Sequence, residues 1–309
     1  MDNESELCES VEIEEISDGS YRHSFIISKA FYGFIFGRLD TIKDLQSETN
    51  TTIPLPDSRK SWSGDVCILG SSREEIITCR EKIHRIAEDS RKNIRYTHFV
   101  SIPLNNDEFK GNYKAFREQI LRDPTREIHG IVDEMFVGGN KLHLTVGMLL
   151  LLDDEEKRKA AETLEKCVED VVQPILTRET EPIRLKIEGL ECMNSNPAKA
   201  SILYGRVEEN RILQELVDKV FGYFIEKGLM KSQYDNKVKL HMTLMKTSRL
   251  RGKSKKHQRQ RTFDATKILE DFGNYEFGET TLDTLHICEC STDVSDGSYP
   301  ILTRIDLIY

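Results

Sequence analysis

Hydrophobic and polar residues alternate with two different periods along the chain, and these periods predict the order of its elements. In residues 21–89, apolar runs with a period of two are interleaved with stretches in which apolar residues recur every three or four positions. The pattern predicts the order β-α-α-β-β-α, with elements at 24–27, 30–36, 39–49, 52–55, 65–69 and 72–89. Ser72 and Glu75 are spaced as a capping box at the start of the last helix. The expected core stripe of that helix is Ile76, Cys79, Ile83 and Ile86.

From residue 97 the same two periods predict a second, larger α+β part. Strands are expected at 99–104, 141–148, 183–190, 201–206, 237–245, 282–288 and 301–307, and helices at 107–121, 153–172 and 210–226. The first of these helices carries an aromatic stripe, made of Phe109, Tyr113, Phe116 and Ile120. Such a stripe is more typical of a buried helix face than of a platform for stacking bases.

One strand pattern of the second part occurs twice, about a hundred residues apart. Residues 141–148 read Lys-Leu-His-Leu-Thr-Val-Gly-Met, and residues 239–246 read Lys-Leu-His-Met-Thr-Leu-Met-Lys. In an extended strand, side chains two positions apart point to the same face, so the histidine and threonine of each copy project together. A repeat of this length indicates two related lobes rather than a solenoid. Two such lobes facing each other would form a site.

The repeated residues supply the groups that general acid and base cleavage of a phosphodiester requires. One neutral histidine can accept a proton from the nucleophile while a second, protonated histidine donates one to the leaving oxygen. Threonine hydroxyls can bind the non-bridging phosphate oxygens. We therefore expect His143 and His241 to be the catalytic pair and Thr145 and Thr243 to bind phosphate, without a metal or other cofactor. The spacing does not tell which histidine is the acid and which is the base.

A single His-x-Thr in an apolar strand is usually a histidine whose hydrogen bonds are satisfied within the fold, so the hypothesis rests on the duplication. The neighbouring lysines follow from the same alternation of side chains. Strict alternation places Lys141 and Lys239 on the histidine side of their strands, where they are candidate nucleic-acid contacts. It leaves Lys246 on the opposite face, which makes that residue the weaker candidate.

The paired strands resemble those of the two-histidine (2H) phosphoesterase superfamily, whose members act on RNA ends, cyclic nucleotides and 2′,5′-linked oligonucleotides. Residues 141–152, 189–194, 213–224 and 239–247 resemble, more narrowly, a family that joins a KH module to a 2H domain. The resemblance implies an RNA-binding protein with a phosphodiesterase-like site for RNA or nucleotide phosphodiesters. It also implies partner subunits, a helicase among them, in a nuclear complex that acts in transcription coactivation and DNA alkylation repair.

Residues 34–56 resemble the signature of a type I KH domain, an RNA-binding βααββα module. The resemblance implies a Gly-x-x-Gly loop that grips the nucleic-acid backbone, but here the loop reads Gly37-Arg38-Leu39-Asp40. The missing second glycine and the negative charge of Asp40 should weaken phosphate binding. Arg38 and Lys43 remain candidate nucleic-acid contacts. The alternative is that this domain packs against the second domain or a protein partner.

The chain is acidic, with 44 Lys and Arg against 53 Asp and Glu residues and a net charge of −9. Any contact with nucleic acid must therefore come from local basic patches rather than from the overall field. The densest basic run follows the second His-x-Thr strand and contains Arg249, Arg251, Lys253, Lys255, Lys256, Arg259 and Arg261. Such a run is most often a solvated loop. Its position also fits a nuclear-import signal or a path for an RNA backbone, with Arg251, Lys253, Lys255 and Lys256 as contacts.

We expect an acidic arm at 1–20, a KH-like domain at 21–92 and a bilobal, pseudo-duplicated 2H phosphoesterase-like domain at 93–309, in which two antiparallel sheets are flanked by helices. No apolar run reaches the length of a membrane span, and the acidic residues 1–15 do not resemble a signal peptide. Seven scattered cysteines without Cys-x-x-Cys favour a reducing compartment, the nucleus or the cytoplasm. The competing hypothesis is a non-catalytic subunit whose cleft recognises RNA ends without cutting them.

Overall fold

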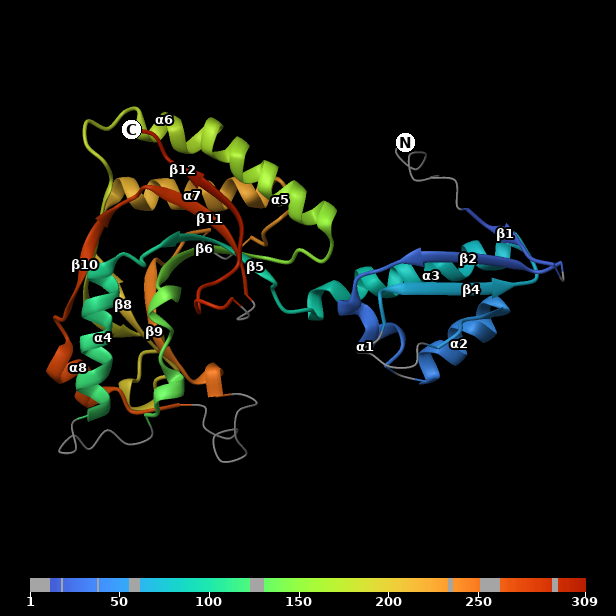
Figure 1. Ribbon diagram of the computed structural model, residues 1–309, viewed down its shortest axis with the longest axis horizontal. Coiled ribbons are helices and arrows are strands. Elements are labelled where there is room, and N and C mark those ends of the chain that lie inside the picture. Colours follow the sequence, from blue (N-terminus) through green and yellow to red (C-terminus); the bar gives the residue numbers. More distant parts are fainter. Residues whose placement is uncertain are drawn as a thin grey trace. The chain divides into compact units, whose positions relative to one another are not determined.

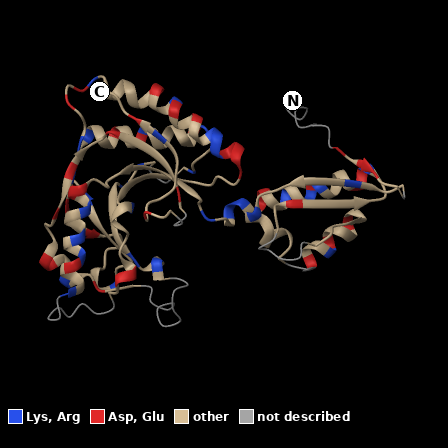
Figure 2. Cartoon of the chain, viewed as in Figure 1, with Lys and Arg blue, Asp and Glu red and all other residues tan. Residues whose placement is uncertain are grey.

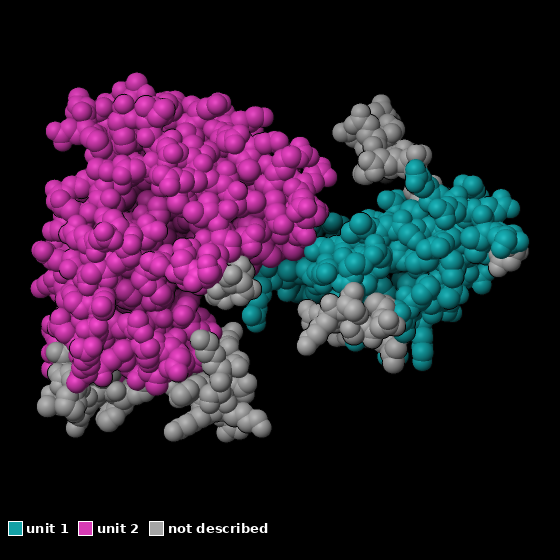
Figure 3. Space-filling model, in the orientation of Figure 1, with its two compact units in different colours: residues 1–95 teal, residues 96–309 magenta. Residues whose placement is uncertain are grey.

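The computed structural model describes residues 12–17, 19–37, 39–55, 62–122, 131–232, 236–250, 262–290 and 294–309. The chain divides into two compact units, residues 1–95 and 96–309 (Figure 3). Each unit has its own sheet and its own set of buried apolar side chains.

The first unit is a four-stranded antiparallel sheet with three α-helices (Figure 1). Its elements are β1 (Glu14–Glu15), β2 (Tyr21–Ile26), α1 (Tyr32–Ile35), α2 (Leu39–Thr49), β3 (Thr51–Thr52), β4 (Asp65–Gly70) and α3 (Arg73–Ser90). The strands lie in the order β1-β2-β4-β3. The predicted order of elements is therefore present, with the short β1 added before it and β3 reduced to two residues.

Helix α3 begins at the predicted capping box. The Ser72 hydroxyl accepts a hydrogen bond from the Glu75 amide, and the Glu75 carboxylate accepts one from the Ser72 amide, both at 3.2 Å. The buried stripe runs through Ile76 and Ile83 and continues to Ala87, whereas Ile86, predicted as core, is half-buried. The four-residue steps along the helix keep Ala87 on the buried face.

The second unit is built on an eight-stranded antiparallel sheet in the order β10-β7-β8-β9-β6-β5-β11-β12. The strands are β5 (His98–Pro103), β6 (His143–Leu149), β7 (Arg184–Cys192), β8 (Ile202–Val207), β9 (His241–Lys246), β10 (Glu276–Thr281), β11 (Thr284–Glu289) and β12 (Ile301–Asp306). The two predicted sheets correspond to its two four-stranded halves, which meet where β6 pairs with β9 and Leu144 lies opposite Met242. The repeated strands are thus the two central ones.

Helices cover each half of this sheet (Figure 1). They are α4 (Asp107–Arg122), α5 (Asp154–Cys167), α6 (Gln173–Leu176), α7 (Arg211–Glu226) and α8 (Thr266–Phe272). Helices α4 and α8 pack against β10 and β7 in one half, and α7 and α5 pack against β6 and β12 in the other. The predicted helix at 153–172 is α5 followed by a π-helical turn at Val168–Val172 that leads into α6. One continuous apolar cluster fills the space between helices and sheet.

Charged side chains lie mostly on the outer faces of the helices (Figure 2). The first turn of α5 contains three acids, Asp154, Glu155 and Glu156, and the Asp153 carboxylate accepts a hydrogen bond from the Glu156 amide at 2.8 Å. Negative charge at this end stabilises the helix because it faces the positive end of the helix dipole.

The aromatic stripe of α4 is core, as predicted, and it meets aromatic residues from the end of the chain. Phe272, Tyr275 and Phe277 surround Phe116, with ring centroids 5.3 to 5.4 Å from it. The sequence analysis predicted neither of the two elements in this region, α8 and β10. Both are short, and their apolar residues follow neither period for long enough to identify them.

Tyr113 of the same stripe ties the strand β9 to the chain that precedes β6. Its buried hydroxyl shares one hydrogen between the carbonyls of Val137 and Leu244, at 2.7 and 2.9 Å, and the Val137 amide also donates to Leu244 O at 2.9 Å. We expect Tyr113→Phe to lower the free energy of unfolding by about 1–2 kcal/mol, because both buried carbonyls lose this donor. Urea unfolding followed by circular dichroism measures the change.

The matched control is Tyr223→Phe, which removes an exposed hydrogen bond to the Asp170 carboxylate. That variant should stay within about 0.5 kcal/mol of the original protein, as substitutions at exposed positions usually do. Equal losses in the two variants would contradict the tethering role of Tyr113.

Candidate functional site

The two His-x-Thr motifs lie side by side at the centre of the sheet. Strands β6 and β9 run antiparallel with Leu144 opposite Met242, so one step along each strand places His143 opposite Thr243 and Thr145 opposite His241. All four side chains are half-buried, whereas Leu144 and Met242 between them are fully buried on the other face. The structure therefore brings the four predicted site residues together as one cluster on one face of the sheet.

Both central strands contain a bulge at the same place in the motif. In β6, Gly147 and Thr145 pair with two consecutive residues of β5, so the residue between them has no partner there. In β9, Met245 and Thr243 pair in the same way with two consecutive residues of β8. Each bulge inserts one extra residue after the threonine and reverses the alternation beyond it. The first six residues of the two strands accordingly share one pattern of burial, half-buried at the first, third and sixth positions.

The bulge corrects the expectation for Lys246. Strict alternation placed this side chain on the face opposite the histidines, but the extra residue returns it to the histidine face, where it is half-buried. Burial lowers the pKa of both histidines, and the positive charge of Lys246 lowers each of them further. Burial and the nearby Arg249 in turn lower the pKa of Lys246 itself. Lys246 is therefore a cation of the site, and the equivalent position of β6 holds Met148.

Backbone carbonyls fix the orientation of both histidine rings. Nδ1 of His143 lies 2.7 Å from the carbonyl oxygen of Lys141, and Nδ1 of His241 lies 2.8 Å from that of Lys239. A carbonyl only accepts, so each Nδ1 carries a hydrogen and Nε2 is the basic nitrogen of the neutral ring. Nε2 of His143 is 3.1 Å from the Thr145 hydroxyl, which donates to it. The basic nitrogen of His143 thus faces Thr145.

A tyrosine and a lysine accompany each histidine. The ring of Tyr299 meets His143 edge-on with centroids 5.5 Å apart, and the Lys141 ammonium lies 4.7 Å from the centre of that tyrosine ring. In the other half Tyr204 meets His241 at 5.3 Å, and the Lys239 ammonium lies 5.1 Å from the Tyr204 ring. These contacts limit the rotation of each imidazole and shield it from water.

The environment keeps both imidazoles neutral over a wide pH range. Burial, opposed by the hydrogen bond to Lys141 and reinforced by the charges of Lys246 and His241, lowers the pKa of His143 to about 4. Burial together with the charges of Lys239 and Lys246 also lowers the pKa of His241. Since burial disfavours the charged form of a histidine, His143 stays neutral to a lower pH than an ordinary histidine, and its Nε2 remains unprotonated.

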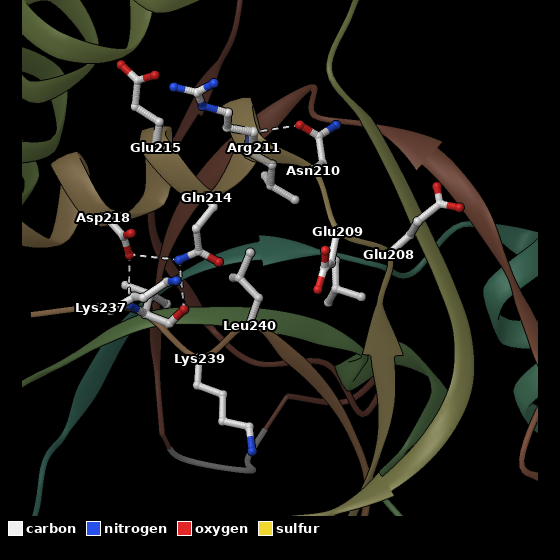
Figure 4. A pocket seen from close by; sticks show the side chains of 13 residues that line it. Glu208, Glu209, Asn210, Arg211, Gln214, Glu215, Asp218, Lys237, Lys239 and Leu240 are labelled. Carbon is white, nitrogen blue, oxygen red and sulfur yellow. Dashed lines mark hydrogen bonds between the residues drawn. The ribbon is translucent and has the colours of Figure 1, made fainter. Parts of the chain in front are cut away.

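The approach to β9 is held by side chains of α7. The Asp218 carboxylate accepts hydrogen bonds from the Val238 amide at 2.7 Å and from Gln214 Nε2 at 2.8 Å, and Gln214 also donates to the Val238 carbonyl at 2.9 Å (Figure 4). They border an open hollow of about 900 Å³ whose wall includes Glu208 and Glu209. Acidic and basic side chains both line this hollow, and the histidines do not. The hydrogen bonds at its border hold Val238, three residues before His241.

The other predicted contact residues are distributed unevenly. Lys239 is exposed beside the site, whereas Lys141 ends a short 3-10 helix (Gly139–Lys141) rather than lying in the strand, and it is only 7% exposed. Lys43 is exposed on α2 in the first unit. The remaining candidates lie outside the described residues: Arg38, Arg251, Lys253, Lys255 and Lys256.

Sequence reasoning did not identify Tyr204, Tyr299 or the role of Lys246. The two tyrosines come from β8 and from the segment before β12, far from either motif, and no local pattern marks them. Only the pairing of each repeated strand with its outer neighbour shows the bulge that redirects Lys246.

In the described parts of the chain, no three His, Cys, Asp or Glu residues gather so that they could hold a metal ion. No helix in the same residues has the length and apolar character needed to cross a membrane.

Comparison with known proteins gives a match over the whole second unit. The model of a family described as AKAP7 2′5′ RNA ligase-like domain matches residues 96–307. The Mus musculus protein activating signal cointegrator 1 complex subunit 1 is 31% identical over 324 aligned residues, which cover 99% of this chain and 89% of that protein.

The solved structures that are similar to this chain include two bacterial proteins. Escherichia coli LigT complexed with 3′-AMP is 16% identical, with a TM-score of 0.44 and coverage of 69% of this chain and 99% of that one. The protein TT0787 of Thermus thermophilus is 17% identical, with a TM-score of 0.44 and coverage of 68% and 97%.

Proposed function

This chain belongs to the family of AKAP7 2′5′ RNA ligase-like domains and of activating signal cointegrator 1 complex subunit 1, and from this membership we propose that it is a 2H-type phosphodiesterase acting on RNA or nucleotide phosphodiesters. The observation that carries the proposal is the duplicated His-x-Thr-x-x pattern on two adjacent central strands, with the same bulge and the same ring orientation in both copies. Two proton-transfer groups side by side are what an in-line displacement at phosphorus needs.

In the proposed mechanism, His143 is the general base and His241 is the general acid. Nε2 of neutral His143 accepts the proton of the attacking hydroxyl or water, and protonated His241 gives its Nε2 proton to the leaving oxygen. The Thr145 hydroxyl, which donates to His143 in the free protein, turns to the phosphate when substrate binds and leaves Nε2 open to the nucleophile. Thr145, Thr243 and Lys246 bind the non-bridging oxygens and stabilise the charge that develops on them.

The assignment of acid and base follows from the surroundings of the two rings. Burial and, to a smaller extent, the charge of Lys246 oppose a positive charge on His143, so this ring stays neutral and can act as the base. His241 is less deeply enclosed and exchanges protons with solvent more easily. In each turnover His143 gains a proton and His241 loses one. The starting protonation state is restored when a proton passes from His143 to His241 through water.

The first unit is proposed to be a KH-like domain that contributes weakly to RNA binding. Its βααββα order and antiparallel sheet support the KH-like fold. Asp40 lies in the first turn of α2, where its carboxylate occupies the end of the helix that would otherwise attract a phosphate. Lys43 on the exposed face of the same helix is the proposed backbone contact of this unit.

We also propose that the chain works as a subunit of an activating signal cointegrator-type complex in the nucleus, with a helicase among its partners, in transcription coactivation and DNA alkylation repair. Support comes from the similarity to the mouse subunit, which extends through both units rather than through the phosphodiesterase-like part alone. The proposed RNA substrate is single-stranded or an RNA end.

Turnover of end-labelled RNAs tests the catalytic proposal. The panel contains 2′,3′-cyclic phosphate, 3′-hydroxyl and 2′,5′-linked ends, each with and without EDTA. The proposal predicts that at least one of these is cleaved, at the same rate with EDTA present. If none is cleaved while RNA still binds in a salt-dependent manner, the chain is an RNA-end recognition or assembly subunit instead.

The pH dependence of kcat/KM follows from the two lowered pKa values. His143 must be neutral, so activity should persist down to about pH 4, the pKa of this ring, and fall below it. His241 must be protonated and its pKa lies below the usual 6.5, so activity should fall as the pH rises through that lower value. The profile should therefore be bell-shaped with its maximum between about pH 4 and 6.5. An optimum above pH 7.5 would contradict this assignment.

A further inference from the structure

The two edges of the eight-stranded sheet carry different charges. The strand β10 forms one edge, and its charged side chains are two exposed acids, Glu276 and Glu279. Acidic charge of this kind discourages pairing with a second copy of the same edge. The strand β12 forms the other edge and, within the described residues, pairs only with β11 (Figure 1). Its charged side chains are one base and one acid, Arg304 and Asp306.

The outer side of β12 presents the backbone groups of Arg304 and Asp306. The Leu307 amide donates a hydrogen bond to the Asp283 carbonyl at 2.8 Å, so Leu307 points its backbone groups toward the neighbouring strand. The pairing with β11 is regular from residue 303 to residue 306. Since the backbone groups of successive residues in an antiparallel strand point to opposite sides, those of Arg304 and Asp306 point away from β11.

The side chains of this edge are complementary to the same strand running in the opposite direction. Arg304 and Asp306 are both exposed, and within one chain the Arg304 Nε donates to the Asp306 carboxylate at 2.9 Å. If two copies pair antiparallel about a twofold axis at Ile305, Arg304 of each copy lies opposite Asp306 of the other. Registers shifted by two residues place Arg304 opposite Arg304, or Asp306 opposite Asp306, which is unfavourable. The charges therefore select one register.

The residue at the centre of this register is apolar. Ile305 is half-buried and packs against the apolar cluster of the second unit. It would lie opposite its own copy as a pair without mutual hydrogen bonds, the position at which cross-strand side chains are closest. The paired segment ends near Ile308, whose side chain is 73% exposed and whose carbonyl already accepts a hydrogen bond from Gln173 Nε2 at 2.7 Å.

We propose that a second copy of this chain docks on β12, so that the two sheets continue into each other across the twofold axis. The Ile305 pair lies at the centre, with an Arg304–Asp306 pair on either side, and each of these outer pairs exchanges two backbone hydrogen bonds. A twofold contact uses the same edge of both copies, so the assembly closes as a dimer. The proposal does not depend on the proposed catalysis, because β5 and β11 separate this edge from β6.

Sedimentation velocity of the full chain over a wide range of concentrations tests the proposal. We expect a reversible equilibrium between monomer and dimer. Arg304→Asp brings acids opposite each other twice in every dimer, so it should lower the association constant about tenfold or more. Asp306→Arg should do the same with two bases. The double variant, Arg304→Asp with Asp306→Arg, restores opposite charges and should recover the original constant to within about twofold.

Arg122→Asp is the matched control for the charge reversals. Arg122 is exposed on α4 and forms an ion pair with Glu118, at 3.4 Å, so the variant also replaces an exposed arginine and breaks an exposed ion pair. It should leave the association constant unchanged, because α4 packs in the half of the sheet that contains β10.

A cysteine at the twofold axis tests the register. Under mild oxidation Ile305→Cys should form a disulfide-linked dimer, because the two sulfurs would face each other across the pair. Thr303→Cys should not, since residue 303 lies opposite Leu307 of the other copy, and the original protein shows the background from its seven native cysteines. A monomer at every concentration, an association constant insensitive to Arg304→Asp, a double variant as weak as the single ones, or cross-linking of Thr303→Cys in preference to Ile305→Cys would overturn the proposal.

Discussion

Replacing either histidine with glutamine is expected to lower kcat/KM by about 10²–10⁴, the usual contribution of general acid or base catalysis. Glutamine keeps much of the volume and the polarity of imidazole but cannot carry a proton in this pH range. Each ring has its own backbone acceptor and its own tyrosine, so His143→Gln and His241→Gln should leave the fold intact. Both variants should still bind a 5′-nucleotide, because binding does not need proton transfer.

His84→Gln is the matched control for these two changes. His84 is an exposed histidine on α3 of the first unit, where it stacks on Phe25. The account predicts no change in kcat/KM for this variant. Activity that survives in either His143→Gln or His241→Gln at the level of the original protein would remove that residue from the mechanism.

Lys246→Met is expected to lower kcat/KM by about 10², because it removes a cation that stabilises charge on the phosphate oxygens. Methionine is what β6 carries at the equivalent position, so the substitution should be tolerated in the bulged strand. The charge of Lys246 also lowers the pKa of His143. Removing this charge should therefore raise that pKa and move the acidic limb of the pH profile upward from about pH 4.

Two further variants separate charge from packing at this position. Lys246→Arg keeps the charge and should retain most of the activity and the original acidic limb. Lys166→Met removes a lysine from the exposed face of α5 and should change neither. If Lys246→Met matches Lys166→Met in both measurements, then Lys246 does not act on the phosphate.

Much of the fold was predictable because its elements obey local rules. The capping box at Ser72, the buried stripe of α4 and the end of α7 near Gly228, whose φ is +72°, each follow from residues within one or two turns of chain. The repeated strands were predictable for the same reason, since their alternation is visible within eight residues. Their place at the centre of one sheet follows from pairing and needed the structure.

The residues that sequence reasoning misplaced or missed depend on long-range pairing. In the bulge of β9, Leu244 has no partner in β8, and its carbonyl accepts hydrogen bonds from Val137 and Tyr113 in other parts of the chain. Alternation within the strand cannot show this, so it gave the wrong face for Lys246. Lys141 was expected to continue the strand, but the preceding turn ends in a 3-10 helix that buries it.

Proton transfer by the two histidines is tested by the pH profile of kcat/KM for His143→Gln and His241→Gln, measured beside the original protein on whichever RNA end that protein cleaves. We expect that the residual activity of His143→Gln no longer falls on the acidic side, and that the residual activity of His241→Gln no longer falls on the alkaline side. Profiles that keep both limbs in both variants, or an original protein that cleaves none of the RNA ends, would contradict proton transfer by this pair of histidines.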